Sequence, residues 1–203
     1  MKFQPPRVKP RTPGFVFNNA EVSKPEMYFS QDECDWIVEY GKQEYPEFAS
    51  VGENGGEVRR ETRDVYVRNI FINERTNGLF DKMMFIADMT NQAHFDFEIA
   101  GIMHGLQLLE YTSHETKQHY DWHVDIGGDS SYGRKIYMVV QLSDPSEYEG
   151  GELQVDEGKP VTMPKERGSV ILFPSYMRHR VTPVTRGTRW SLVIWVQGYT
   201  HFR

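Results

Sequence analysis

The chain has 203 residues, of which 38% are hydrophobic and 26% are charged, and its formal net charge is -6. That length fits about one globular domain, and no stretch approaches the roughly 18 to 20 apolar residues of a membrane helix. The basic, proline-broken start lacks the apolar core of a signal peptide, so we expect a cytoplasmic protein with no membrane span. The acidic balance disfavours nucleic acid as a partner, and the single cysteine, Cys34, excludes an internal disulfide.

The first part of the chain predicts an arm followed by two helices. Residues 1–27 contain five of the eleven prolines, which is typical of an extended arm, with a packed strand near 14–17 as the alternative. Residues 28–203 contain no repeat and no linker, so we expect a single domain there. A capping-box pattern at Ser30 and Glu33 predicts a helix over 31–44, and apolar spacing predicts a second helix over 77–91.

The second part of the chain is rich in short strands. A first strand is predicted at 65–72, next to an arginine-rich segment, 59–68, that we interpret as a solvated strand edge. After residue 92, short runs of aromatic and β-branched residues alternate with turn residues, and their number predicts an antiparallel sandwich or barrel, of which the jelly roll is one form. The two helices would cover one sheet face. The predicted strands are 94–99, 105–111, 119–125, 135–142, 151–155, 168–173, 179–184 and 190–198.

One short motif suggests a metal site. His123 and Asp125 are two residues apart, so on one strand their side chains would share a face. An imidazole and a carboxylate form two thirds of the facial triad that holds non-haem Fe(II). His179, which follows another apolar strand, is the best candidate for the third ligand, although a strand-end histidine bonded to backbone would look the same. Arg189, ten residues further on, fits a turn between adjacent strands that returns a guanidinium to the pocket, where it would need an anion or a structural carboxylate as its partner.

Taken together, these residues resemble the Fe(II)- and 2-oxoglutarate-dependent oxygenases, in particular the prolyl 4-hydroxylase branch with the bacterial PKHD-type proteins. The resemblance covers residues 105–197 and implies a mainly β protein, with a double-stranded β-helix (jelly-roll) core at about 94–198 and N-terminal helices packed on one sheet. The segments that carry it are YDWHVD (120–125), LSDP (142–145), YEGGEL (148–153), GSVILFP (168–174), His179 to Arg189 with its Val181, Pro183, Val184 and Gly187, and Trp195.

The resemblance also implies roles for individual residues. His123, Asp125 and His179 would be the iron ligands, and Arg189 would hold the distal carboxylate of 2-oxoglutarate. Arg134 resembles an arginine that faces substrate. The remaining cofactor-binding candidates are Tyr111, Gln141, Ser191 and Trp195.

Several of these assignments have plainer alternatives. Gln141 stands where the branch often has a tyrosine, and the segment 112–119 before the motif lacks the glycines often found there. Ser191 could be an ordinary strand serine, Trp195 a core residue, and Arg134 an exposed residue at a strand start. The glycine-containing loop 50–63 matches the position of a substrate-covering lid, and an ordinary surface loop would have the same composition.

By this resemblance the protein is an enzyme that uses Fe(II), 2-oxoglutarate and O2, with ascorbate as a candidate reductant. It would couple the conversion of 2-oxoglutarate to succinate and CO2 to hydroxylation of an unactivated C–H bond, with a prolyl residue of a peptide or protein as the first choice. The alternatives are the same chemistry on a free amino acid, another side chain or a nucleobase, and a jelly-roll module that binds metal or peptide without turnover.

Overall fold

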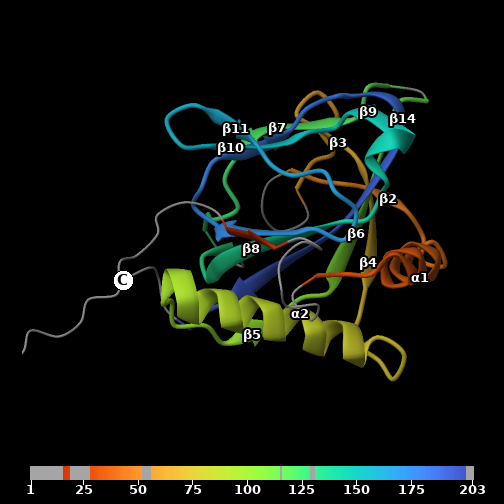
Figure 1. Cartoon of the computed structure of the whole chain (residues 1–203). Helices are drawn as coiled ribbons and strands as arrows, with labels where there is room; N and C mark the ends of the chain where they lie inside the picture. The colour runs from red at the N-terminus through yellow and green to blue at the C-terminus, as the bar shows by residue number, and fades with distance from the viewer. Residues whose placement is uncertain (1–15, 19–27, 52–55, 115, 129–130, 200–203) are drawn as a thin grey trace, which may run out of the picture.

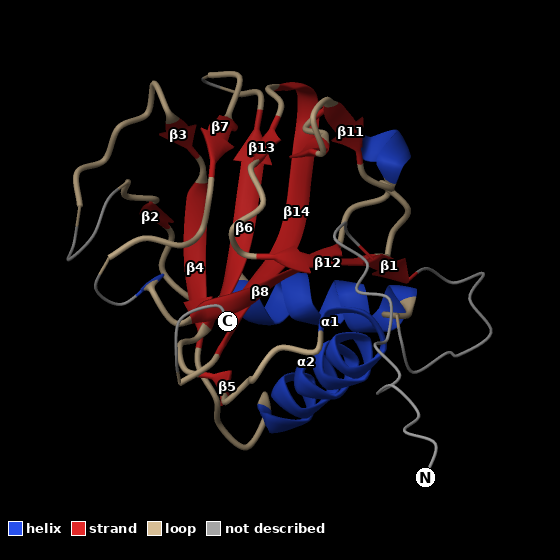
Figure 2. Cartoon of the chain, turned by 90° about the vertical axis from the view of Figure 1, so that its left-hand side faces the viewer, coloured by secondary structure: helices blue, strands red, loops and turns tan. Residues whose placement is uncertain are grey.

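The structure is a computed structural model that describes residues 16–18, 28–51, 56–114, 116–128 and 131–199. Two antiparallel sheets lie face to face, and both α-helices pack on the outer side of the larger sheet (Figures 1 and 2). Within the described residues, no helix has the length and apolarity needed to cross a membrane.

The larger sheet has nine strands in the described part of the chain, two of which, β5 and β9, pair with β14 outside the main path. The main path runs β1 (Val16–Asn18), β12 (Val170–Pro174), β8 (Arg134–Gln141), β14 (Val184–Gln197), β6 (Leu106–Thr112), β4 (Tyr66–Ile70), β2 (Glu47–Phe48), and the side strands are β5 (Gly101–Ile102) and β9 (Tyr148–Gly150).

The smaller sheet forms the opposite layer and carries the strands that matter most for the site. Its order is β11 (Pro160–Thr162), β10 (Leu153–Asp156), β13 (His179–Val181), β7 (His119–His123), β3 (Arg63–Asp64). The two strands with candidate ligands, β13 and β7, are therefore hydrogen-bonded neighbours.

The strand β8 shows how the layers are joined, because its side chains alternate between two hydrophobic clusters. Ile136 and Met138 lie in the cluster shared with the helices, whereas Tyr137 and Val139 lie in the cluster between the two sheets. Side chains along a strand point to opposite faces in turn, so a strand that is apolar throughout must be covered on both sides. The predicted mainly β architecture with helices on one sheet is confirmed.

The helices follow the prediction closely. In α1 (Gln31–Gly41), the Ser30 hydroxyl accepts from the Glu33 N–H at 3.2 Å, and the Glu33 carboxylate accepts from the Ser30 N–H at 2.8 Å. This reciprocal cap fixes the start of the helix, which ends three residues earlier than predicted. The second helix, α2 (Asn77–Thr90), is followed by a π-helical turn, η2 (Asn91–Phe95), and a 3-10 turn, η4 (Pro145–Glu147), precedes β9.

Three sequence predictions need correction or restriction. The strand predicted at 94–99 is wrong: the chain there leaves η2 into a loop, because the Asn91 amide group bonds both the N–H and the carbonyl of Phe97. The predicted strand 190–198 begins earlier, at Val184. The predicted arm 1–27 lies outside the described residues except for β1, which pairs with β12. The same holds for residues 52–55 of the predicted lid.

Candidate metal centre and its pocket

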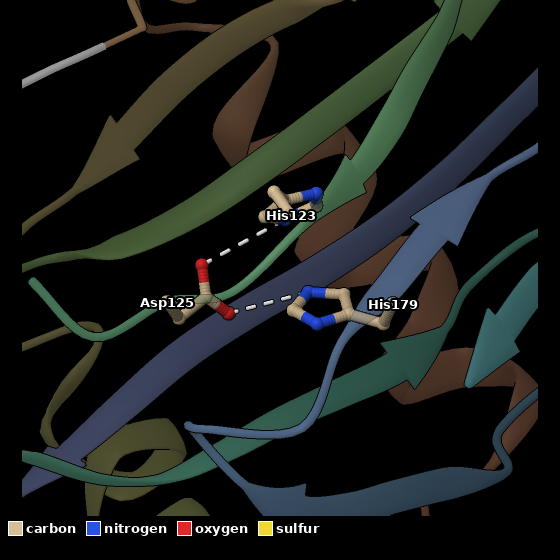
Figure 3. A group of neighbouring side chains, drawn as sticks. All are labelled: His123, Asp125 and His179. Carbon is tan, nitrogen blue, oxygen red and sulfur yellow. Dashed lines mark ion pairs between the residues drawn. The ribbon is translucent and has the colours of Figure 1, made fainter. Parts of the chain in front are cut away.

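Three side chains predicted as metal ligands lie together on the smaller sheet (Figure 3). His179 on β13 stands directly opposite His123 on β7 in the antiparallel register. Their Nε2 atoms lie 3.3 Å and 3.8 Å from the two carboxylate oxygens of Asp125. One ligand atom from each of the three residues lies within 4.8 Å of the others.

The position of Asp125 differs from the prediction, which placed it on the same strand face as His123. β7 ends at His123, and Asp125 lies two residues beyond that end. Its backbone N–H donates to the carbonyl of Ser175 at 3.0 Å, in the turn that leads into β13. The turn between the sheets, rather than strand alternation, therefore brings the carboxylate between the two imidazoles.

Both imidazoles are oriented by backbone carbonyls. Nδ1 of His123 lies 2.7 Å from the carbonyl oxygen of Asp121, and Nδ1 of His179 lies 3.0 Å from that of Met177. A carbonyl oxygen can only accept, so each Nδ1 carries the proton and each Nε2 presents a lone pair to the cluster. Metal-bound histidines show this arrangement, in which the second ring nitrogen fixes the tautomer and the ring direction.

The protonation states also suit a metal. Burial lowers the pKa of His123 to about 3, with the neighbouring His179 acting in the same direction. Burial opposes ionisation of Asp125, but the two imidazoles outweigh it and hold the pKa of this carboxyl below its usual range. At neutral pH the cluster therefore offers a neutral His123 imidazole and a carboxylate, the forms that bind metal.

Arg189 is buried away from the protein's own acids. It is 1% exposed, and none of the described carboxylates lies within ion-pair distance of it. Its Nη2 donates to Oε1 of Gln141 at 2.9 Å, and its Nη1 donates to Oγ of Ser191 at 3.3 Å. Its guanidinium carbon lies 5.5 Å from the ring centre of Tyr111, the residue opposite it on β6.

The path of the chain to Arg189 also differs from the prediction. β13 and β14 are not adjacent strands, because β13 belongs to the smaller sheet and β14 to the larger one. The chain crosses between the sheets at Thr182 and Pro183, and β14 then pairs with β9, β6 and β8. Arg189 thus belongs to the larger sheet, whereas the two histidines of the metal cluster belong to the smaller one.

A cavity of about 430 Å³ opens beside the cluster. Its lining includes the three candidate ligands together with four residues singled out in the sequence or next to them in space, namely Tyr111, Tyr137, Arg134 and Trp195. Gln141, Ser191 and Arg189 are not among the residues that line it; they form a buried polar group behind Tyr111.

Two residues at this cavity were missed as site residues by the sequence reasoning. The ring of Tyr120 stacks on His123, with ring centres 3.4 Å apart and planes 12° apart. Arg63 packs on the same tyrosine, with its guanidinium carbon 4.7 Å from the Tyr120 ring centre. The prediction of a solvated edge for 59–68 is wrong for Arg63, which lines the cavity, and for Arg68, which pairs with Glu110 at 2.7 Å.

The unsatisfied polar atoms of the site fit a bound cation and a bound anion. Nε2 of His179 and Oδ2 of Asp125 are buried without a hydrogen-bond partner, and so is Nε of Arg189. Buried polar groups are nearly always satisfied, so orphans at a metal-type cluster and at a guanidinium indicate ligands that complete them. A donor set of two imidazoles and one carboxylate suits Fe(II) with open positions, and also suits zinc.

Comparisons with known proteins agree with this chemistry. Residues 106–197 match the family model of the 2OG-Fe(II) oxygenase superfamily. A PKHD-type hydroxylase of Crocosphaera subtropica is 33% identical over 109 residues, which cover 52% of this chain and 49% of that protein. The PKHD-type hydroxylase YbiX of Escherichia coli is 34% identical over 121 residues, which cover 55% of this chain and 52% of that protein. The chain thus spans about half the length of the curated relatives it matches.

Solved structures share the fold across nearly the whole chain. A Pseudomonas putida prolyl-4-hydroxylase has a TM-score of 0.71 at 18% identity, covering 93% of this chain and 95% of that one. A Trichoplax adhaerens prolyl hydroxylase, solved with a hypoxia inducible factor peptide fragment, has a TM-score of 0.71 at 18% identity, covering 92% and 84%. Residues 106–197 of the chain thus resemble the 2OG-Fe(II) oxygenase superfamily, a family that uses Fe(II), 2-oxoglutarate and O2. Within that superfamily, the curated relatives named above are PKHD-type hydroxylases, and the prolyl hydroxylase structures share the fold.

Proposed function

We propose that this protein is a hydroxylase that uses Fe(II) and 2-oxoglutarate to oxidise a prolyl residue of a peptide or protein. The observation that carries the proposal is the pairing of His179 with His123 across β13 and β7, with the Asp125 carboxylate 3.3 Å and 3.8 Å from their Nε2 atoms. His123, Asp125 and His179 would hold the iron. When bound, iron and 2-oxoglutarate supply the oxidising power for inserting one oxygen atom of O2 into a C–H bond.

The chain's own residues have separate tasks in this proposal. The carbonyls of Asp121 and Met177 keep both Nε2 lone pairs directed to one point, which the side chains alone would not do. Arg189 would hold the distal carboxylate of 2-oxoglutarate, since a buried guanidinium without an acidic partner is stabilised by a bound anion.

The neighbours of Arg189 support the same task. Gln141 and Ser191 accept two of its N–H groups and fix the plane of the guanidinium. Nε of Arg189 stays without a partner and remains available to an incoming carboxylate. Tyr111 lines the cavity next to this guanidinium and would position the cosubstrate.

Two observations favour a peptide over a free amino acid. A second cavity of about 570 Å³ shares Gln107, Arg134 and Trp195 with the first, so space continues past the metal cluster in one direction. Its apolar lining includes Phe71, which is 65% exposed. An extended substrate needs such a continuation for residues next to the one that reacts, and a free amino acid does not.

Mass spectrometry on a library of proline-containing peptides tests the proposal. Peptides are incubated with Fe(II), 2-oxoglutarate and ¹⁸O2, and we expect a mass gain of one ¹⁸O atom on proline together with stoichiometric succinate. The His179→Ala variant is the negative control. Succinate formation without oxygen on any proline would refute the prolyl substrate, and failure to form succinate with any substrate would refute the oxygenase itself.

A further inference from the structure

Two arginines line the cavity that contains the metal cluster, and each packs against an aromatic ring. Arg63 stands opposite Tyr120 in the β3–β7 pair, and its guanidinium lies 4.7 Å from the centre of that ring. Tyr120 in turn stacks on His123. Arg63 is therefore one ring away from a candidate metal ligand, and its Nη1 is anchored on the carbonyl of Ser50 at 3.0 Å.

Arg134 reaches the same cavity from the larger sheet. It is the first residue of β8, and its guanidinium lies 4.1 Å from the ring of Trp195. Its Nη1 lies 3.4 Å from the backbone carbonyl oxygen of Asp125, to which it donates. Both arginines line the cavity that contains the metal cluster.

Stacking occupies the face of a guanidinium and leaves its N–H edge free. For both arginines, Nε is buried and has no hydrogen-bond partner. None of the carboxylates in the described chain lies within ion-pair distance of either side chain. A partly buried cation whose edge donors are unsatisfied is a built site for a planar anion, because a carboxylate can accept two parallel N–H groups.

Most of the nine other described arginines are paired with an acid. Six of them already have a carboxylate within 4.0 Å: the pairs are Arg59–Glu57, Arg60–Asp64, Arg68–Glu110, Arg167–Asp35, Arg178–Asp156 and Arg186–Glu149. The three others without an acid have different partners: Arg75 lies over the ring of Tyr40, and Arg180 and Arg189 donate to the side-chain oxygens of Gln154 and Gln141. Arg63 and Arg134 are the two described arginines that line the cavity.

The charge of the cavity points the same way. Asp125 is the only acidic residue among its described lining residues. A divalent cation more than neutralises that carboxylate, and the two guanidiniums add to the positive charge. The cavity stays positive even after a dianionic cosubstrate has entered, so its field favours a negatively charged group on the second substrate.

We propose that the substrate presents a carboxylate to the free edges of Arg63 and Arg134, from an aspartate, a glutamate or a chain end close to the residue that is oxidised. This inference rests on the proposed function and names the substrate class for that site: an acidic peptide. Recognition by two stacked guanidiniums gives specificity for a planar anion, because an amide of the same shape offers only one acceptor oxygen and no charge.

A binding selection tests this without turnover. The probe is a library of 12-residue peptides with a central proline and randomised flanks, applied to protein loaded with Mn(II) and 2-oxoglutarate. We expect the retained peptides to be enriched at least fivefold in aspartate and glutamate over asparagine and glutamine. Half of the library has amidated ends, so enrichment that persists there assigns the carboxylate to a side chain, and enrichment confined to the other half assigns it to the chain end.

Three variants decide whether the two arginines are responsible. Arg63→Gln and Arg134→Gln should each reduce the acidic enrichment to near unity, and Arg63→Lys should keep part of it. The control Arg59→Gln removes an arginine of the same segment that is paired with Glu57 and lies outside the cavity, and it should leave the enrichment unchanged.

Some results would overturn the inference. These are equal retention of acidic peptides and their amide counterparts, retention of no peptide, or an Arg63→Gln variant that weakens 2-oxoglutarate binding while its peptide preference is intact. Wild-type protein that hydroxylates neutral and acidic peptides equally well would refute this inference and leave the proposed function standing. Absence of any 2-oxoglutarate turnover would refute the function itself.

Discussion

Each histidine of the cluster is aimed by a carbonyl two residues earlier in its own chain, so the local backbone decides where the lone pairs point. His123 bonds Asp121, and His179 bonds Met177, at 2.7 Å and 3.0 Å. Because these carbonyls fix both rings, the two Nε2 atoms already point towards the Asp125 carboxylate, and metal binding needs little rearrangement. Replacement of either ring should therefore act on metal affinity first and on the fold second.

The variant His179→Ala tests this at one residue. We expect Mn(II) affinity to fall by at least about 100-fold, because loss of a ligand costs more than the 10- to 100-fold typical of an outer partner. Titration calorimetry with Mn(II) measures the change. His119→Ala is the matched control, since that ring lies at the other end of β7 and bonds only the backbone carbonyls of Lys117 and Glu61. Unchanged affinity in His179→Ala would contradict the assignment.

Arg189 has a different predicted effect because it does not touch the metal cluster. Arg189→Gln should raise the 2-oxoglutarate concentration needed for half-maximal succinate formation by about 10- to 100-fold, the worth of a hydrogen bond to a charged group. Metal content, measured by atomic absorption, should stay near the wild-type value. Arg186→Gln is the control: it lies three residues earlier on β14, is exposed, and pairs with Glu149. A normal 2-oxoglutarate requirement in Arg189→Gln would move the carboxylate to Arg63 or Arg134.

At the scale of elements, β14 is the strand that joins several parts of the larger sheet and carries Arg189. Its start pairs with β9, and the rest of the strand pairs with β6 and β8. Gly187, which has a positive φ of 73°, allows the close approach to the 3-10 turn before β9. A Cβ atom added there would overlap the backbone carbonyl oxygen of Glu147. Gly187 thereby helps to fix the position of the backbone at Arg189, two residues later on β14.

Gly187→Ala should lower the free energy of unfolding by more than about 3 kcal/mol, since the backbone must shift in addition to the strain of a positive φ. Gly158→Ala separates the two effects: Gly158 also has a positive φ, of 85°, but a Cβ there meets nothing within 4 Å. Its cost should be about 1 kcal/mol. Urea denaturation measures both, and equal costs would show that the close approach to Glu147 does not matter.

The helix α1 carries a buried thiol, Cys34, whose ionisation should make the free energy of unfolding depend on pH. Burial raises the pKa of Cys34 to about 11, whereas the unfolded value is near 9. Between these values the unfolded state loses its proton first, so the free energy of unfolding falls as the pH rises from 9 to 11. Compared with Cys34→Ala, the wild type should lose about 2 kcal/mol more over this range. Parallel curves for the two proteins would show that the thiol ionises equally in both states.

At the scale of the whole molecule, sequence reasoning succeeded where chemistry is local and failed where two sheets meet. The capping box at Ser30 lies within a few residues and is present as predicted. His123 and Asp125 do lie in one cluster with His179, but through a turn and not through a shared strand face. The path of the chain from one sheet to the other could not be predicted. The hydrogen bond between Asp125 and Ser175 and the crossing at Pro183 both depend on contacts between segments that are distant in the sequence. The same limit hid Arg63, whose role becomes visible only when β3 pairs with β7.

The central claim is that one metal cluster and one buried guanidinium together bind 2-oxoglutarate. Calorimetric titration of 2-oxoglutarate into the protein, with and without Mn(II), tests it most directly. We predict one equivalent bound to the Mn(II)-loaded wild type, weaker binding to Mn(II)-loaded Arg189→Gln, and none to the metal-free protein or to His179→Ala. Binding of 2-oxoglutarate that is absent with Mn(II), or equally strong without it, would contradict the account.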